Sequence, residues 1–372
     1  MKFSIMVEQL DRIASQLNSI ATHQPLTPID GSVLIEVGTS TVNFTSTDRQ
    51  CELRYTVPVL SQQEGKVAVP VRLLSQIAKV LRKEEPCELA FDQERSVLSV
   101  SSGLSLFDLQ TLPADDFPEL ANDEYDNEFV MDADTLKDML NRTKFAAAKD
   151  DQRQFLRGVH FNLVEKDNKK VFDGVATDGF RMAIISHKAP EGLNEFPGII
   201  VAEKSAAIIS RIFNSDENVT VSYTQEKIRL VSDGTRFTSL LLANDYPEYN
   251  RLIPSDSDLN LSIDVKTLLF GLREVLTVSS DVKENVTLNI TKDKVALKVS
   301  SVGQGQAKTE LSGTFTGEKE LTMRFVGTHL AGVLEIIDDG TADFTLNETN
   351  GAIKITKQGD DTAVFVVMPQ KN

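Results

Sequence analysis

The 372-residue chain has few of the residues from which common binding and catalytic sites are built. Its two cysteines, Cys51 and Cys87, are too few and too far apart for a disulfide framework or a zinc site. No apolar run reaches the roughly 18 residues that a membrane-spanning helix needs. The opening stretch, MKFSIMVEQLDRI, is interrupted by acidic residues too early for a signal peptide. We therefore expect reduced, partly buried thiols in a cytosolic protein that has no membrane partner.

Recognisable catalytic patterns are also missing. The four histidines are His23, His160, His187 and His329. None of them falls at a metal-ligand spacing, and no phosphate loop, nucleophile elbow or complete dinucleotide-binding glycine pattern occurs. Acidic pairs at 115–116 and 338–339 fall at expected turns and helix ends, where solvated side chains explain them better than acid–base catalysis. We expect no catalytic residues, no metal and no cofactor.

What the chain does contain is a long-range repeat. Three segments, beginning at Phe3, Phe129 and Leu261, open with a short apolar strand and continue into an amphipathic helix. In the first and third, apolar residues recur at three- and four-residue steps, which predicts one buried stripe on each helix. Alternating, strand-like stretches follow in each copy, then a second strand and helix, then more strands.

The repeat predicts six helices and three domains. The predicted helical segments are 7–21, 70–84, 132–148, 203–214, 264–278 and 327–338. Pro70 stands where the second helix should start, a position that tolerates proline. The first two copies end alike, in DFPEL at 116–120 and DYPEY at 245–249, and an acidic linker follows each. We place the domains at 1–127, 128–254 and 255–372.

Each copy therefore has two strand–helix–strands halves, and the expected fold class is α+β. Two helices on one face of a mostly antiparallel sheet form such an arrangement. Short strands with an apolar face need the sheet to continue, so exposed edges at the chain's ends invite pairing with another copy. A head-to-tail contact between end units closes into a ring if the rotation closes.

Charge is distributed unevenly between the predicted helices and the rest of the chain. The net charge of −16 should repel nucleic acid, yet the six helical segments together carry +1 and the remainder −17. One interpretation is that charges on solvated helix faces are ordinary. The other is a weakly positive helical lining that contacts phosphates without reading bases. The candidate cations are Arg12, Arg72, Lys79, Arg82, Lys83, Lys137, Arg142, Lys144, Lys204, Arg211, Lys266 and Arg273.

Two short stretches stand out from the repeat. The first is VATDGFRM at 175–182, and Thr47-Asp48-Arg49 echoes it in the first copy, so a structural turn accounts for part of it. Gly179 would serve the tight backbone of that turn, and Asp178 would cap it. The second is VVMP at 366–369, close to the last residue. This apolar strand is either an edge strand or part of an apolar groove that holds a partner's linear peptide.

Together these features resemble the bacterial sliding clamp family, the beta subunit of DNA polymerase III. ATDGFRMA at 176–183, YPEYNRLIP at 246–254 and VVMP keep the family's order and spacing, and the resemblance covers the whole chain. It implies a head-to-tail homodimeric ring of six domains around duplex DNA, with helices lining the hole and antiparallel sheets outside. Such a ring is a non-catalytic processivity factor, cytoplasmic and nucleoid-associated, that needs no sequence specificity. The implied partners are the replicative polymerase alpha subunit, the clamp-loader ATPase, and other polymerases and repair proteins with linear motifs.

The resemblance also implies where the sites lie. The family's peptide groove lies between the second and third domains, with apolar positions that seat a partner's leucine and phenylalanine and with arginines at the rim. The implied groove residues are Leu156, Thr177, Gly179, Phe180, Arg181, Met182, Pro247, Arg251, Leu252, Val366, Val367, Met368 and Pro369. The implied ring contact sets Phe107 and Leu109 against Leu276–Val278. Departures from the family pattern are Phe180 for histidine, Val326 for asparagine, His329 for tyrosine and Gln24 for arginine.

Two other interpretations stay open. A repeat scaffold that binds peptides but not DNA also explains the acidity and the missing active site. An enzyme whose site follows no familiar spacing is the third. A strict monomer in sedimentation would favour the scaffold.

Overall fold

A computed structural model describes residues 1–22, 27–59, 61–120, 124–125, 127–243, 245–255, 257–279, 285–301, 303–347 and 351–370. These residues contain the six predicted α-helices. They are α1 (Val7–Asn18), α2 (Val71–Val80), α3 (Ala133–Thr143), α4 (Glu203–Ile212), α5 (Val265–Leu276) and α6 (Gly327–Ile337). In the described part of the chain no helix combines the length and the hydropathy that crossing a bilayer requires.

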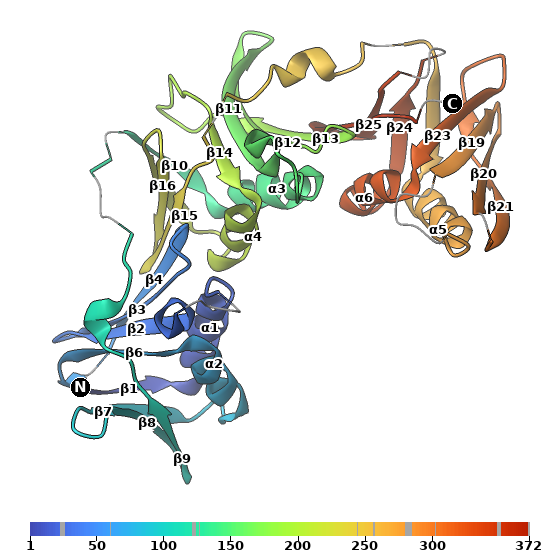
Figure 1. Ribbon diagram of the computed structural model, residues 1–372. Helices are drawn as coiled ribbons and strands as arrows, with labels where there is room; N and C mark the ends of the chain where they lie inside the picture. Colours follow the sequence, from blue (N-terminus) through green and yellow to red (C-terminus); the bar gives the residue numbers. More distant parts are fainter. Residues whose placement is uncertain are drawn as a thin grey trace. The chain divides into compact units, whose positions relative to one another are not determined.

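The helices form where the sequence pattern predicts them because each buries one apolar stripe. Leu10, Ile13 and Leu17 of α1 are buried, and α1 packs against α2 as α5 packs against α6 (Figure 1). Two of the helices begin at an aspartate cap: Asp132 accepts from the Thr135 amide, and Asp264 accepts from the Thr267 amide at 2.8 Å. These caps satisfy amides that no helical carbonyl can reach.

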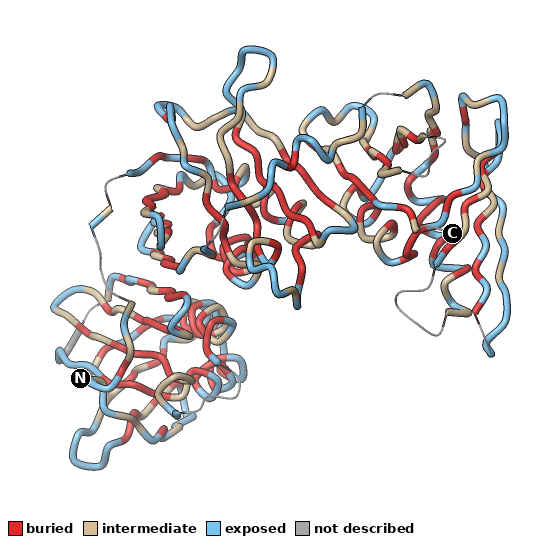
Figure 2. The backbone as a smooth tube through the Cα atoms, turned by 45° about the horizontal axis from the view of Figure 1, so that its top comes forward, coloured by how far each residue is buried: buried red, intermediate tan, exposed pale blue. Residues whose placement is uncertain are grey.

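The chain folds into two compact units, and both draw on more than one predicted domain. Unit 1 comprises Met1–Lys137, Pro190–Leu193 and Lys204–Leu241, and unit 2 comprises Asp138–Ala189, Asn194–Glu203 and Leu242–Asn372. In each unit the buried residues lie along the strands and on one side of the helices, whereas the residues at hairpin ends are exposed (Figure 2).

Unit 1 contains two antiparallel sheets. The eight-stranded sheet runs in the order β10 (Asn127–Asp132), β15 (Asn218–Tyr223), β16 (Lys227–Ser232), β17 (Thr235–Leu240), β4 (Cys51–Pro58), β3 (Thr41–Thr47), β2 (Ser32–Val37), β6 (Gly65–Pro70). The five-stranded sheet runs in the order β5 (Ser61–Gln63), β1 (Lys2–Met6), β7 (Pro86–Asp92), β8 (Val97–Ser102), β9 (Ser105–Gln110). Pairing of Phe237 with Leu53 joins strands from the first two sequence repeats.

Unit 2 also contains two antiparallel sheets. The nine-stranded sheet runs in the order β14 (Ile199–Ala202), β11 (Gly158–Lys166), β12 (Lys169–Thr177), β13 (Arg181–Lys188), β26 (Asp360–Val367), β25 (Ile353–Lys357), β24 (Thr341–Thr345), β18 (Asn260–Asp264), β22 (Thr314–Phe315). The four-stranded sheet runs in the order β21 (Gly305–Ser312), β20 (Lys294–Ser301), β19 (Asn285–Thr291), β23 (Leu321–Val326). Here β13 and β26 join the second repeat to the third.

The two cysteines are buried and unpaired, in agreement with the predicted reduced thiols. Burial raises the pKa of Cys87 to about 11, and the pKa of Cys51 also rises because of burial. Both therefore act as small packing residues.

Candidate functional site

The turn between β12 and β13 has the capped geometry that its sequence predicts. The Thr177 hydroxyl donates to the Arg181 carbonyl at 2.7 Å and accepts from the Gly179 amide at 3.0 Å. One carboxylate oxygen of Asp178 accepts from the amides of Phe180 and Arg181, each at 2.9 Å. Gly179 has a φ of 88°, a left-handed conformation in which a side chain is strained. The turn is therefore rigid, and it presents Phe180 outward.

The two stretches that stood out in the sequence meet in one sheet. Arg181 and Met182 of β13 pair with Val367 and Val366 of β26. The amide of Met368, just past β26, donates to the carbonyl of Phe180 at 2.8 Å. The terminal apolar strand is thus an interior strand of the nine-stranded sheet, and its end lies beside the turn.

An apolar cluster lies behind this junction. It contains Val175, Met182, Ile184, Tyr249 and Val366, with Tyr246 and Ile253 packed against it. Three large side chains nearby remain exposed: Phe180 at 53%, Leu252 at 54% and Met368 at 41%. Exposed apolar side chains over a packed apolar floor are typical of a peptide-binding surface.

A buried polar network anchors the segment that contains Tyr249. The Tyr249 hydroxyl donates to Asp173 at 2.8 Å, and this carboxylate is completely buried. Lys166 Nζ lies 2.8 Å from the same carboxylate, and the Ser186 hydroxyl donates to it at 2.7 Å. Burial and the Asp173 carboxylate raise the pKa of Tyr249. A buried carboxylate needs such partners, so the network holds the 3-10 turn Tyr249–Leu252 in place.

His160 supports the preceding tyrosine of this segment. Its ring stacks on Tyr246 with centroids 4.4 Å apart and planes 6° apart. The His160 Nδ1 and the Tyr246 hydroxyl are buried and have no hydrogen-bond partner among the described residues. Burial lowers the pKa of His160 to about 4, so the ring is neutral at pH 7. It is therefore a packing histidine. His23 lies outside the described residues.

A cleft of about 430 Å³ opens beside Phe180. Val326, His329, Asp151 and Gln370 contribute to its walls, and the Phe180 and His329 rings lie 5.8 Å apart. Arg181 is turned inward here, with its guanidinium carbon 5.1 Å from the Phe145 ring centroid and its Nε 3.1 Å from Asp178. Three residues that depart from the family pattern thus line the same cleft: Phe180, Val326 and His329.

The other predicted groove residues take different positions in unit 2. Leu156, Thr177, Met182, Val366, Val367 and Pro369 are buried or nearly so. Pro247 and Arg251 are exposed, and Arg251 pairs with Glu248 at 2.6 Å. Sequence reasoning missed Asp173, His160 and Tyr249 as structural supports. Two signals pointed to the segment that contains Tyr249: the shared DFPEL and DYPEY pattern, and the YPEYNRLIP stretch at 246–254.

The predicted DNA-facing cations lie on or next to helices, and about half of them are paired. Arg142 pairs with Asp138 and Asp360, Lys204 with Asp48, and Arg273 with Glu335. Arg82, Lys83 and Lys137 also have acidic partners, whereas Lys144 bonds the Asn141 side chain. Within the described chain, no ion pair involves Arg12, Arg72, Lys79, Arg211 or Lys266, and all five are exposed. Gln24 lies outside the described residues.

The predicted ring-contact residues lie near two sheet edges. Strand β9 is an edge of the five-stranded sheet, and β21 is an edge of the four-stranded sheet. Phe107 is partly exposed, but Leu109 is 1% exposed and packs into its own sheet, so it offers no surface for a contact. Leu106, which is 66% exposed, is the apolar side chain that β9 presents instead. Leu276 and Val278 are partly exposed at and after the end of α5.

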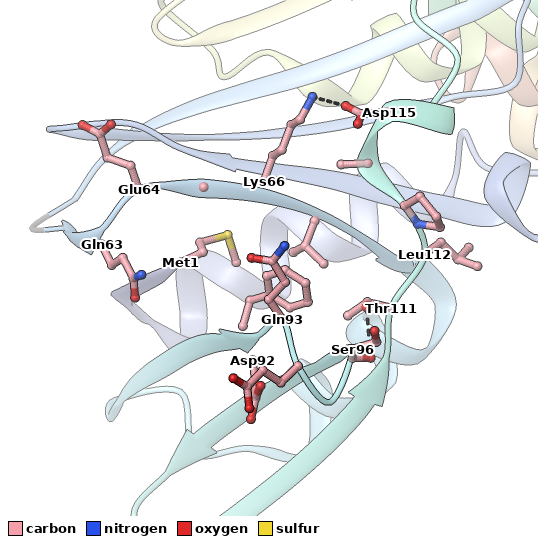
Figure 3. Close-up of a pocket in the computed structure, with 16 residues that line it drawn as sticks. Met1, Gln63, Glu64, Lys66, Asp92, Gln93, Ser96, Thr111, Leu112 and Asp115 are labelled. Atoms are coloured by element: carbon pink, nitrogen blue, oxygen red, sulfur yellow. Dashed lines mark hydrogen bonds and ion pairs between the residues drawn. The ribbon is translucent and has the colours of Figure 1, made fainter.

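A hollow of about 800 Å³ in unit 1 holds none of the predicted site residues. It lies between β6, the β7–β8 hairpin and residues 111–115 (Figure 3). Some of its polar groups pair with one another: Lys66 pairs with Asp115, and the Thr111 hydroxyl donates to the Ser96 carbonyl. Elsewhere in the described residues, no three His, Cys, Asp or Glu side chains group as metal ligands.

The fold is that of a DNA sliding clamp. A crystal structure of the Caulobacter crescentus beta sliding clamp superimposes with a TM-score of 0.93 at 25% identity, covering 100% of this chain and 99% of that one. The Bartonella birtlesii clamp bound to griselimycin gives 0.93 at 27% identity, covering 100% of both chains.

The sequence comparisons agree with the fold. Residues 1–121, 130–248 and 250–371 match the N-terminal, central and C-terminal domains of the DNA polymerase III beta subunit. The Escherichia coli beta sliding clamp is 27% identical over 373 residues and the Caulobacter vibrioides one 26% over 370, covering 99% or more of each chain. The chain belongs to the DNA polymerase III beta subunit family, and its function is that of a DNA sliding clamp that supports processive synthesis.

Proposed function

We propose that the chain forms half of a closed homodimeric ring around duplex DNA and recruits partners through the groove beside Phe180. The main support is the place where the Thr177–Arg181 turn meets the end of β26. Exposed apolar side chains lie there over a buried apolar cluster. The ring is non-catalytic and acts in the cytoplasm with the nucleoid. The domain boundaries near 127 and 254 are part of this proposal.

The groove takes a short linear peptide that inserts leucine and phenylalanine side chains. Phe180, Leu252 and Met368 are the exposed apolar contacts, and Arg251 supplies a charge at the rim. The Bartonella clamp bound to griselimycin supports a ligand site on this family's fold. The partners that carry such peptides are the polymerase alpha subunit, the clamp-loader ATPase, and other polymerases and repair proteins.

DNA contact rests on the helices, where the acidic excess of the chain is absent. Arg12, Arg72, Lys79 and Arg211 of unit 1 are exposed and form no ion pair with another described residue. They would contact phosphates without reading bases, which suits a protein that slides.

Ring closure rests on the free edges of two sheets. Strand β9 of one copy would pair with β21 of the next, so that sheets of five and four strands become one of nine. Edge pairing between end domains is a heterologous contact, and two such contacts close a dimer. The apolar side chains of Leu106 and Phe107 would be covered in the process.

Sedimentation of an edge variant tests this arrangement. Leu106→Asp places a charge on the β9 edge, and we expect it to shift the dimer toward monomer at micromolar concentration. The control is Val80→Asp, at another exposed apolar side chain of unit 1, which should remain dimeric. A wild-type chain that sediments as a monomer at all concentrations would refute the ring.

A further inference from the structure

We propose that the eight-stranded sheet of unit 1 carries a phosphate-binding cleft between Arg54 and Arg236. A cleft of about 410 Å³ opens on this sheet. Its hydrogen-bonding side chains are Thr41, Asn43, Arg54, Thr56, Thr235 and Arg236. Two guanidiniums share this hollow with the hydroxyls of Thr41, Thr56 and Thr235 and with Val231 and Gly234, in a chain whose net charge is −16. This site is separate from the peptide groove and from the helices assigned to DNA.

The two arginines lie directly opposite each other. Arg236 of β17 pairs in register with Arg54 of β4. Like charges at such positions destabilise a sheet unless something neutralises them. Burial and the charge of Arg54 lower the pKa of Arg236, and Arg229 of β16 adds to the effect. The sheet therefore places two positive charges side by side at this point.

The acidic groups that face the pair do not use all of its donors. Glu52 Oε1 lies 3.3 Å from Arg236 Nη2, and this carboxylate also accepts from the Leu120 amide. Glu36 Oε2 lies 3.9 Å from Arg54 Nη2, at the limit of an ion pair. The Arg54 Nε donates to the Thr45 hydroxyl at 3.0 Å.

Donors are left over on both guanidiniums. The Arg236 Nε is buried and has no hydrogen-bond partner among the described residues. Within that part of the chain, the hydrogen bonds of the two guanidiniums come from Arg54 Nε and Arg236 Nη2, and Nη1 of neither arginine forms one. A buried donor without an acceptor is costly, and an anion in the cleft would supply one.

The geometry favours a tetrahedral oxyanion over a carboxylate. A planar carboxylate satisfies the fork of one arginine, whereas phosphate directs oxygens toward both guanidiniums and toward neighbouring hydroxyls. Adjacent strands hold the two arginine backbones about 5 Å apart, which a single phosphate can bridge. The recognised group is therefore phosphate, either free or as an ester.

The test uses the full-length protein in buffers of matched pH and ionic strength. Inorganic phosphate should raise Tm in a saturable manner, and acetate should not. Arg236→Gln and Arg54→Gln should each weaken the apparent phosphate affinity at least about fivefold, since each removes a charged partner. Without phosphate, Arg54→Gln should melt no lower than wild type, because it relieves the opposition of like charges. Arg236→Gln also removes the ion-pair partner of the buried Glu52 carboxylate and should melt lower, so its phosphate response is measured from its own Tm.

The matched control is Arg49→Gln, which alters an exposed arginine of the same unit that pairs with Asp30 outside the cleft. It should keep the phosphate response. Ribose 5-phosphate distinguishes free phosphate from a phosphate ester as the ligand. A rise in Tm equal to that with inorganic phosphate would assign the site to phosphate esters. A smaller rise would assign it to the free anion. Equal responses to phosphate and acetate in wild type, or an equal loss in Arg49→Gln, would overturn the proposal.

Discussion

At the scale of single residues, the groove depends on a buried carboxylate. Asp173 is completely buried, and its hydrogen bonds reach Lys166, Ser186 and Tyr249. Tyr249 is 76 positions away in sequence, so no local pattern links the two residues. For this reason the sequence predicts the exposed groove residues from a motif but not the network that holds one wall in place.

Removing the Tyr249 hydroxyl should loosen that wall. We expect Tyr249→Phe to lower the free energy of unfolding by about 1–2 kcal/mol and to weaken peptide binding, because Asp173 loses one hydrogen bond. The measurements are urea unfolding and peptide titration.

The same substitution three residues earlier provides the control. The buried Tyr246 hydroxyl has no hydrogen-bond partner among the described residues, so Tyr246→Phe should be neutral or slightly stabilising. Equal destabilisation by both variants would show that the Asp173 bond has no special role.

His160 predicts a dependence of stability on pH. Burial lowers its pKa to about 4, whereas in the unfolded chain it is near 6.5. The unfolded state therefore binds more protons between these values, and stability should fall as pH drops from about 6.5 to 4, by up to about 3 kcal/mol.

His160→Leu should remove this part of the pH dependence. Leucine is chosen because unit 1 has a leucine in a similar place: Leu34 packs with Phe117 of DFPEL, as His160 packs with Tyr246 of DYPEY. Chemical unfolding at several pH values measures how steeply the free energy of unfolding changes with pH in wild type and in His160→Leu. An unchanged slope between pH 6.5 and 4 in His160→Leu would assign the effect to other groups.

At the scale of elements, one turn-and-strand arrangement occurs twice. Asp48 accepts from the amides of Gln50 and Cys51, as Asp178 does from those of Phe180 and Arg181. The amide of Leu240, the last residue of β17, donates to the Gln50 carbonyl at 2.8 Å, the same bond that Met368 makes to Phe180. The similar sequences after Thr47 and Thr177 therefore form the same turn. The two turns differ in their side chains: Phe180 is exposed where the first turn has Gln50.

This equivalence gives the groove a matched pair of variants. Met368→Ala should weaken binding of a leucine- and phenylalanine-containing peptide about tenfold, because it removes an exposed apolar contact. Leu240→Ala makes the same kind of change at the equivalent place in unit 1 and should leave affinity unchanged. Fluorescence anisotropy of a labelled peptide measures both. A larger loss from Leu240→Ala would place the site in the other unit.

Point substitution tests the groove better than truncation does. Deleting residues from Val366 onward should abolish peptide binding, but Val366 and Val367 are buried and pair with β13 and β25. Their loss would disturb the sheet, whereas Met368 is exposed.

The elements differ in how far the sequence predicts them. All six helices were predicted, but the third was expected to reach 148 and ends at Thr143, whose hydroxyl donates to the Met139 carbonyl. The second ends at Val80 rather than at 84. The pairings of β4 with β17 and of β13 with β26 were not predicted, because partners so distant in sequence share no turn.

At the scale of the whole molecule, three sequence repeats fold into two units. Each unit joins strands of two repeats in one long sheet, and each retains a shorter sheet with free edges. Pairing with another copy of the chain would complete these sheets, and the proposed ring would cover one edge at each end of the chain.

Retention on DNA tests this account most directly. After loading by a clamp loader, a topologically linked ring should remain on circular duplex DNA through gel filtration in high salt, because screening weakens phosphate contacts but leaves the link intact. Linearising the circle should release the protein, since the ring slides off a free end. We expect retention of a closed ring on the circle and its loss from the linear form. Equal retention on both would contradict this expectation.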